Sequence, residues 1–153
     1  MRYMKVGPEA PYRLGEKASF NEDPNSWRYG SKPYITIDLV LLGLPIPDLT
    51  TSIGVYLATE ALAKELIRFT GLKQRDFTLS LDEQMTGLGN FDQKQVPQLV
   101  CFEVDGGLGE TDFARVKGVP RLLVSERAMQ TLQQFNLGHA RIEPFDPDES
   151  RRK

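Results

Sequence analysis

The stretch RLLVSERAMQTLQQFNLGHARIEPF, from Arg121 to Phe145, holds a complete strand–helix–strand pattern. Its first apolar run ends at Ser125, a residue type that favours the N-cap of a helix, and Glu126 then places an acid in the first helical turn. Three apolar side chains follow at helical spacing: Met129, Leu132 and Phe135. The pattern predicts a strand, a helix that ends within the letters NLGH, and a second strand over ARIEPF.

Nearly the same layout occurs sixty-six residues earlier, in YLATEALAKELIRFTGLKQRDFTL (Tyr56–Leu79). Here Thr59 and Glu60 stand where Ser125 and Glu126 stand in the later stretch, and Gly71 is the expected helix end. Over residues 56–69 the shifted alignment gives four identical pairs, whereas chance would give about one. The pairs are Leu57 with Leu123, Glu60 with Glu126, Leu66 with Leu132, and Phe69 with Phe135. Duplication explains this similarity, and so does convergence, because every capped helix after a strand needs these residue types.

The sequence therefore predicts a single α+β domain over residues 1–153, in which two similar strand–helix–strand units, 55–79 and 121–145, pack on a mainly antiparallel sheet. Two further stretches predict strands, Pro33–Leu44 and Leu99–Gly106. Residues 1–33 are rich in proline, glycine and charge, and we expect an irregular arm with at most a short strand at Arg2–Val6. Residues 146–153 are expected to form a flexible tail.

Composition narrows the classes of function. The net charge of −2 and the isoelectric point near 5.5 argue against a nucleic-acid binder that relies on a basic surface. No apolar stretch approaches the roughly 20 residues that a transmembrane helix needs, so we expect no membrane partner. The first residues carry no continuous apolar segment of the secretory type. A single cysteine excludes an intrachain disulfide, and we expect a cytoplasmic protein.

Reactive side chains are scarce. With one histidine, His139, and one cysteine, Cys101, the chain cannot assemble a conventional zinc site. Cys101 lies in a predicted core strand, where a buried and inert thiol is the usual outcome, so a Cys–His nucleophile is disfavoured. The glycine-rich DGGLGETD (Asp105–Asp112) matches neither phosphate-binding fingerprint and predicts a turn between strands. We therefore expect no cofactor, no metal and no enzymatic activity.

Acidic residues concentrate in one part of the chain. From Asp76 to Asp112 there are eight acids and a single base, Lys94. One interpretation is a solvated loop surface that keeps the protein in solution. The alternative is a docking face for a basic partner, because an acidic patch speeds encounter and repels wrong partners. The predicted contact residues are Asp82, Glu83, Asp92, Asp105, Glu110 and Asp112.

Three quoted stretches resemble one family: PYRLGEKASF (Pro11–Phe20), the central Thr-Glu helix unit, and the closing RLLVSERAMQTLQQFNLGHARIEPF. They are similar to small bacterial immunity-like proteins of polymorphic and contact-dependent toxin systems, a group that includes the myxobacterial-type immunity protein domain. The similarity is strongest over Leu122–Phe135. It implies a cytoplasmic, non-catalytic protein that binds a cognate toxin and blocks its active site or its access to substrate. It supplies no catalytic motif and no binding residue.

Three hypotheses follow. The first is an immunity protein that neutralises a toxin with a basic surface. The second is a small enzyme that uses carboxylates of the 76–112 region, which requires two of them in one pocket with strongly shifted pKa values. The third is a structural or adaptor protein that assembles with itself as a homo-oligomer.

Overall fold

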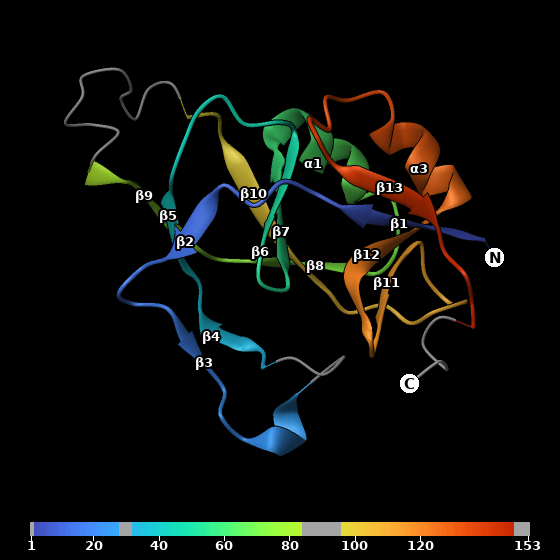
Figure 1. The fold of residues 1–153 in the computed structure, drawn as a ribbon, viewed down its shortest axis with the longest axis horizontal. Helices are drawn as coiled ribbons and strands as arrows, with labels where there is room; N and C mark the ends of the chain where they lie inside the picture. Colours follow the sequence, from blue (N-terminus) through green and yellow to red (C-terminus); the bar gives the residue numbers. More distant parts are fainter. Residues whose placement is uncertain (1, 28–31, 84–95, 149–153) are drawn as a thin grey trace.

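The computed structural model describes residues 2–27, 32–83 and 96–148 (Figure 1). In these ranges the strands form two four-stranded sheets, one three-stranded sheet and one strand pair, and they are accompanied by two α-helices. The sheets are mostly antiparallel, which confirms the predicted α+β class. Neither α-helix of the described ranges has the length and apolar character needed to cross a membrane.

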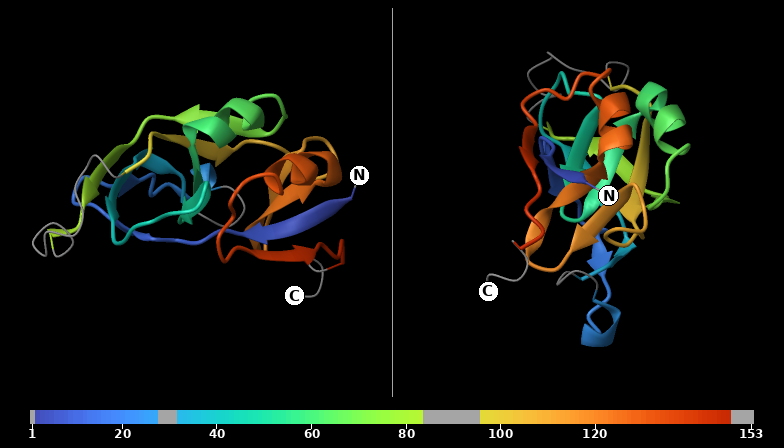
Figure 2. Two further views of the ribbon diagram at one scale, coloured as in Figure 1. Left: turned by 90° about the horizontal axis from the view of Figure 1, so that it is seen from above. Right: turned by 90° about the vertical axis from the view of Figure 1, so that its right-hand side faces the viewer.

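The first sheet, called the β12 sheet, stands at one end of the molecule (Figures 1 and 2). Its spatial order is β11 (Phe113–Val116), β12 (Val119–Ser125), β1 (Tyr3–Gly7) and β13 (Arg141–Pro144), with every neighbour antiparallel. β1 confirms the short strand expected at Arg2–Val6, but it is an interior strand of this sheet, so the arm expected over residues 1–33 is not irregular at this point. Met4 pairs with both Val124 and Pro144, and Val6 is fully buried, so β1 contributes to the core as well as to the sheet.

The second sheet, called the β7 sheet, has the order β6 (Leu49–Ser52), β7 (Val55–Thr59), β10 (Leu99–Val104) and β8 (Leu72–Arg75), again antiparallel throughout. Both sheets arrange their elements in the same way. A hairpin, β6–β7 or β11–β12, leads into a helix, and the strand after that helix, β8 or β13, lies at the sheet edge. A strand from elsewhere in the chain, β10 or β1, separates that edge strand from the hairpin.

The two helices begin where the sequence predicts. Helix α1 (Glu60–Leu66) follows Thr59, and α3 (Glu126–Leu132) follows Ser125. The Ser125 hydroxyl accepts a hydrogen bond from the backbone N–H of Ala128 over 3.3 Å, as an N-cap residue does. The Thr59 hydroxyl makes no capping bond and donates to Asp48 instead, over 2.8 Å, so its predicted N-cap role is not fulfilled by the side chain.

Both helices are shorter than predicted. They end at Leu66 and Leu132, well before Gly71 and the NLGH segment. Phe69 and Phe135 lie beyond these ends, half-buried against the core, and each backbone N–H bonds to the carbonyl three residues earlier, at Leu66 and Leu132. The tighter turn redirects the chain away from the helix axis.

One hydrophobic core joins the two sheets and the two helices. Buried residues of α1 (Leu62 and Leu66) and of α3 (Met129 and Leu132) pack in a single cluster with residues of both sheets. The sheet residues in the cluster are Val6, Leu49, Tyr56, Ala58, Phe102, Val104, Phe113, Leu122 and Val124. The apolar stripes therefore face a shared core, but two sheets enclose it where the sequence predicted one.

A third sheet covers the other face of the β7 sheet. It contains β2 (Tyr12–Leu14), β5 (Asp38–Leu41) and β9 (Thr78–Leu81), with β5 and β9 parallel. The expected strand Pro33–Leu44 is divided at buried Ile37, because β4 (Tyr34–Thr36) pairs with β3 (Ser19–Phe20) rather than with this sheet. A short 3-10 helix, Pro24–Ser26, follows β3. Leu39, Leu41 and Tyr12 form a second core against Leu57 and Cys101.

Candidate protein-binding surface

The structure does not gather the six predicted contact residues on one face. Asp105 and Glu110 are exposed on the segment between β10 and β11. Asp82 follows β9 and lies 3.5 Å from Nε of Arg13, and Glu83 follows it. Strand β9 stands at the opposite end of the molecule from β11 (Figure 1). Asp92 lies outside the described residues, so the candidate surface is the segment that carries Asp105 and Glu110.

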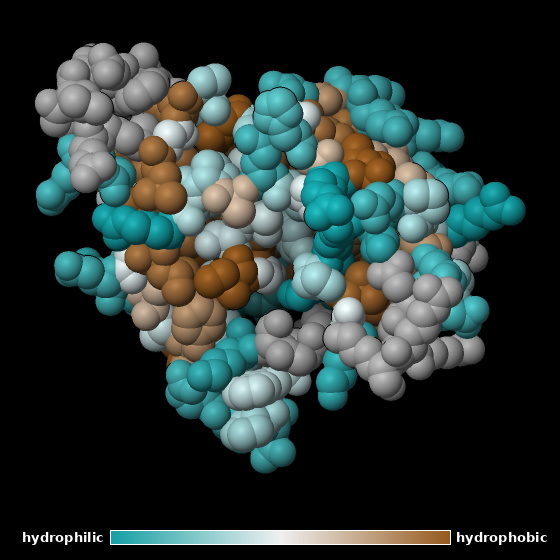
Figure 3. Space-filling model, in the orientation of Figure 1, coloured by the Kyte–Doolittle hydropathy of each residue, from teal (hydrophilic) through white to brown (hydrophobic). Residues whose placement is uncertain are grey.

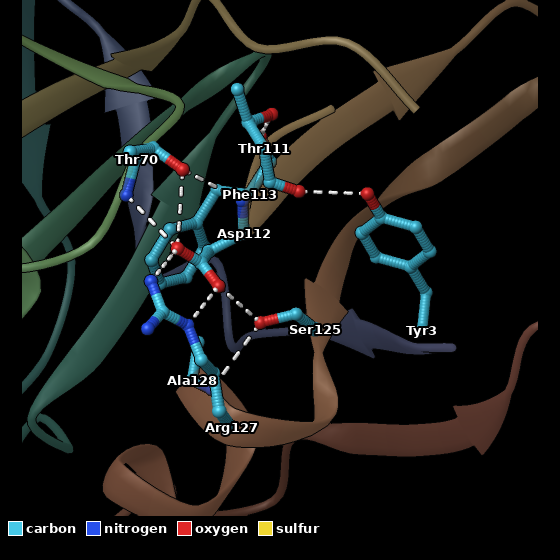
Figure 4. A network of polar contacts seen from close by, with 8 residues as sticks. All are labelled: Tyr3, Thr70, Thr111, Asp112, Phe113, Ser125, Arg127 and Ala128. Atoms are coloured by element: carbon cyan, nitrogen blue, oxygen red, sulfur yellow. Dashed lines mark hydrogen bonds and ion pairs between the residues drawn. The ribbon is translucent and has the colours of Figure 1, made fainter. Parts of the chain in front are cut away.

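Asp112, the sixth predicted contact residue, is not on a surface. Its exposed fraction is 2%, and its carboxylate is occupied by neighbouring donors (Figure 4). Oδ1 accepts from Nε of Arg127 over 2.8 Å and from the Ser125 hydroxyl over 2.7 Å. Oδ2 accepts from Nη2 of Arg127 over 2.8 Å, and from the backbone N–H and hydroxyl of Thr70 over 3.2 and 3.1 Å. The prediction that Asp112 contacts a partner is therefore wrong, because a carboxylate with these bonds is buried and committed.

The electrostatics of this Asp112 cluster (Asp112, Ser125, Arg127 and Thr70) follow from its geometry. The Arg127 guanidinium, helped by the hydrogen bonds from Ser125 and Thr70, holds the pKa of the Asp112 carboxyl well below its usual range despite burial. Arg127 also lies over the ring of Phe69, 5.4 Å from its centroid. Asp112 is thus an ionised anchor for the donors that surround it.

Asp48 has a parallel set of contacts in the other half of the molecule. It directly precedes β6, as Asp112 directly precedes β11. Thr59 donates its hydroxyl to Oδ1 of Asp48 over 2.8 Å, and the backbone N–H of Asn136 donates to Oδ2 over 2.8 Å. In both places the aspartate accepts a hydrogen bond from the residue just before the helix of the same half: Thr59 before α1 for Asp48, and Ser125 before α3 for Asp112. These contacts make the Asp48 cluster (Asp48, Thr59 and Asn136).

Residues 105–110, called the 105–110 loop, are fixed at several points although most of them are exposed. The backbone N–H of Asp105 donates to the carbonyl of Gly71 over 2.9 Å, and that of Glu110 to Gly107 over 3.0 Å. Gly106 is buried, and a Cβ there would stand 2.0 Å from Oγ1 of Thr111 and 2.3 Å from the carbonyl oxygen of Phe113. Only glycine fits this position, and the loop conformation is therefore defined by packing.

Tyr3 of β1 holds the tip of the same loop. Its hydroxyl accepts from the backbone N–H of Gly109 over 2.8 Å and donates to the carbonyl of Thr111 over 2.7 Å. Burial raises the pKa of Tyr3, so the hydroxyl stays protonated and keeps both bonds. Sequence reasoning missed Tyr3, Thr70 and Arg127, because these contacts span up to 108 residues and leave no local signal.

Leu108 gives the loop an apolar element. It is 40% exposed and lines a groove of about 600 Å³ at the end of the β12 sheet. Apolar side chains from β1, β13 and the chain beyond β13 supply most of its wall, including Tyr3, Met4, Pro144 and Phe145, and Glu126 of α3 contributes a carboxylate. On the face drawn in Figure 3, apolar residues form separate patches divided by hydrophilic ones.

The enzyme hypothesis requires two carboxylates in one pocket. The groove beside Leu108 is lined by one, Glu126, and a second groove of about 450 Å³ along β8 is also lined by one, Asp76. Within residues 2–27, 32–83 and 96–148, no three His, Cys, Asp or Glu side chains gather where they could hold a metal ion. Cys101 is fully buried in β10, as expected, and His139 is exposed on the loop after α3. Neither groove therefore has the geometry that this hypothesis needs.

Comparison with known proteins adds no relative. No family model matches the chain, and no curated protein or solved structure matches it either.

Proposed function

We propose that this chain is an immunity protein, which binds a cognate bacterial toxin without catalysis and blocks the toxin's active site or its access to substrate. The observation that carries the proposal is the 105–110 loop. It exposes Asp105, Leu108 and Glu110 on a backbone that is held by Gly71, Tyr3 and the adjoining Asp112 cluster. The toxin as partner rests on the resemblance of Leu122–Phe135 to the immunity-like family.

A fixed loop suits tight binding. Ordering a loop on association costs free energy, and a loop that is already ordered avoids that cost. Leu108 supplies apolar area, while Asp105 and Glu110 supply negative charge beside it. An acidic edge around an apolar contact increases the association rate with a basic protein and repels acidic ones. The toxin we expect presents a basic surface, as nucleases do.

The scaffold under this loop is proposed to consist of the two equivalent strand–helix–strand units, 55–79 and 121–145. The identical order of elements in the β7 and β12 sheets supports this, and so do the matched Asp48 and Asp112 clusters. We place the protein in the cytoplasm, where a toxin entering or made in the cell would be met.

The test is affinity capture from the organism that carries the gene, with the wild-type chain as bait and mass spectrometry as the readout. The proposal expects one stoichiometric partner that stops growth when it is expressed alone and is harmless when coexpressed with this chain. The Asp105→Lys/Glu110→Lys double variant should capture that partner poorly. Capture of a harmless protein, or of further copies of this chain only, would refute the proposal.

A further inference from the structure

The position that the groove occupies at the end of the β12 sheet has an equivalent position at the end of the β7 sheet. Tyr3 pairs with Ser125 at the end of the β12 sheet, and Leu99 pairs with Thr59 at the matching end of the β7 sheet. The backbone N–H of Phe145 donates to the carbonyl of Tyr3 over 3.1 Å, which extends the β1–β13 pairing by one residue. Extending the β10–β8 pairing from Cys101 and Arg75 in the same way sets Phe77 opposite Leu99.

In the β7 sheet this position is covered by the chain itself. Leu99 and Phe77 pack in one cluster with Leu39 and Leu41 of β5, and with Tyr12 of β2. Strands β2 and β5 both belong to residues 8–48, the long connection between β1 and β6. An extended strand of alternating aliphatic side chains thus packs over this end of the β7 sheet.

In the β12 sheet the same position borders a groove, although Tyr3 itself is only 6% exposed. Tyr3 and Phe145 line the groove of about 600 Å³, and their cluster is the smallest of the three apolar clusters in the described chain. The connection here is short, because residues 105–112 lead directly from β10 to β11 and form only the 105–110 loop. No strand of the described residues covers the groove.

We propose that this groove receives one extended segment of the partner protein, with aliphatic side chains that pack on Tyr3, Leu108 and Phe145. The aliphatic strand over Leu99 and Phe77 shows the kind of segment that fits such a position. The two charged residues that line the groove are Glu126 and Arg2, and Glu110 follows Leu108 closely, so the acids at this rim outnumber the base and favour a basic flank. Arg2 lies 4.0 Å from Glu126, but both side chains are mostly exposed, so a partner cation can replace this weak pair.

This inference rests on the proposed function only for the identity of the protein that brings the segment. The first probe is therefore independent of any toxin. It is a synthetic peptide that carries IDLVLL (residues 37–42 of this chain) between two lysine pairs. Its control carries the same core between two glutamate pairs. Amide chemical shifts of the isotope-labelled protein report where each peptide binds.

The lysine-flanked peptide should shift the resonances of Tyr3, Leu108, Gly109 and Phe145, and the glutamate-flanked peptide should bind about tenfold more weakly. Leu108→Glu should abolish these shifts, whereas Leu42→Glu should not. Leu42 is a similarly exposed leucine (45% against 40%) that directly follows β5, a strand at the opposite end of the molecule from β11 (Figure 1). Both variants replace an exposed side chain, so equal thermal unfolding midpoints will show that they fold. Binding elsewhere, or shifts that survive Leu108→Glu, would overturn the inference.

The captured toxin separates the two proposals. A toxin that binds wild type and Leu42→Glu equally, but Leu108→Glu at least about tenfold more weakly, supports the groove as the docking site. A toxin whose affinity is unaffected by Leu108→Glu overturns the groove and leaves the immunity function in place. Peptide binding in the groove together with the absence of any toxin partner supports the groove and refutes the immunity function.

Discussion

Thr70 and Asn136 lie in different halves of the molecule, and each donates a hydrogen bond to an aspartate of the opposite half. Thr70 follows α1 of the β7 sheet, and its backbone N–H donates to Asp112, which precedes β11 of the β12 sheet. Asn136 follows α3 of the β12 sheet, and its backbone N–H donates to Asp48, which precedes the first strand of the β7 sheet. The two bonds are reciprocal, so they hold the halves together at two matched points.

The two clusters should differ in strength. Asp112→Ala should lower the free energy of unfolding by about 2–3 kcal/mol, because it leaves the buried Ser125 hydroxyl without its acceptor and removes the bonds from Thr70 and Arg127. Arg127 is mostly exposed and is resolvated, which limits the loss. Asp48→Ala removes fewer bonds and no arginine pair, so about 1–2 kcal/mol is expected. Urea denaturation measures both, and Asp105→Ala, an exposed acid, should change stability by less than about 0.5 kcal/mol.

Asp112 should also make stability depend on acid pH. Its pKa is lower in the folded protein than in the unfolded chain, so the stability it contributes is complete above the unfolded value of about 4. That contribution is lost as pH falls below this value toward the folded pKa. The difference in unfolding free energy between wild type and Asp112→Asn should therefore shrink steadily from pH about 4 downward. A constant difference across this range would mean that the carboxylate is not preferentially ionised in the fold.

Cys101 should be unreactive in the native protein. Burial raises the pKa of its thiol to about 12, and it has the same effect on the Tyr12 hydroxyl. A thiol reagent at neutral pH should label Cys101 only after urea unfolds the chain. Because both groups hold their protons more tightly when folded, the stability that they contribute should be complete below pH about 9 and should be lost as pH rises toward about 12. Rapid labelling without denaturant would contradict this description of the β7 sheet.

The turn between β6 and β7 contains a residue, Ile53, whose replacement should stabilise the protein. Ile53 has a φ of 30°, and it is followed by Gly54 with a φ of 85°, in a two-residue hairpin closed by Ser52 and Val55. A β-branched residue in the left-handed region is strained, whereas asparagine tolerates it. Ile53 is 62% exposed, so Ile53→Asn should raise the unfolding free energy by about 0.5–1 kcal/mol. The control, Ile67→Asn, alters a similarly exposed residue whose φ of −66° lies in the right-handed helical region. It should not raise the unfolding free energy.

Charge reversal at Asp105 and Glu110 should act on the association rate with the toxin. The double lysine variant should bind about tenfold more slowly at low salt, and the salt dependence of its association should be flatter. The matched control is Glu16→Lys/Asp76→Lys, which changes the net charge equally at two exposed acids away from the 105–110 loop. Stopped-flow kinetics at low and high salt compares them. Equal slowing by both variants would indicate a general charge effect with no local acidic contact.

The signals that the sequence reveals are local ones. The starts of α1 and α3 are confirmed because an N-cap residue and a first-turn acid are adjacent in the chain. The predicted ends of these helices are wrong, because Thr70 and Asn136 leave the helix path to reach distant aspartates. No short stretch of sequence contains both an aspartate and the residue that bonds to it. The burial of Cys101 follows from its apolar strand and was expected.

The candidate site could be predicted only in part. Asp105 and Glu110 are exposed, and their loop follows from its glycines, but the anchor at Tyr3 lies more than a hundred residues away. Asp112 has the same local sequence character as those two acids, yet it is buried because Arg127 and Ser125 approach it from the end of β12 and the start of α3. A charge count along the chain cannot distinguish an acid at a surface from one that is paired in the interior.

The place of β1 between β12 and β13 has a consequence for biosynthesis. Tyr3 pairs with Ser125, and Met4 pairs with Pro144, so β1 is synthesised more than a hundred residues before either of its partner strands. The β7 sheet can assemble from β6, β7, β8 and β10 while synthesis continues, but the β12 sheet cannot close until β13 has been released. Closing so long a loop is slow, because its entropy is lost before the contacts form. During that interval β1 is an unpaired apolar strand on the nascent chain, and this is when the protein most needs protection by a chaperone.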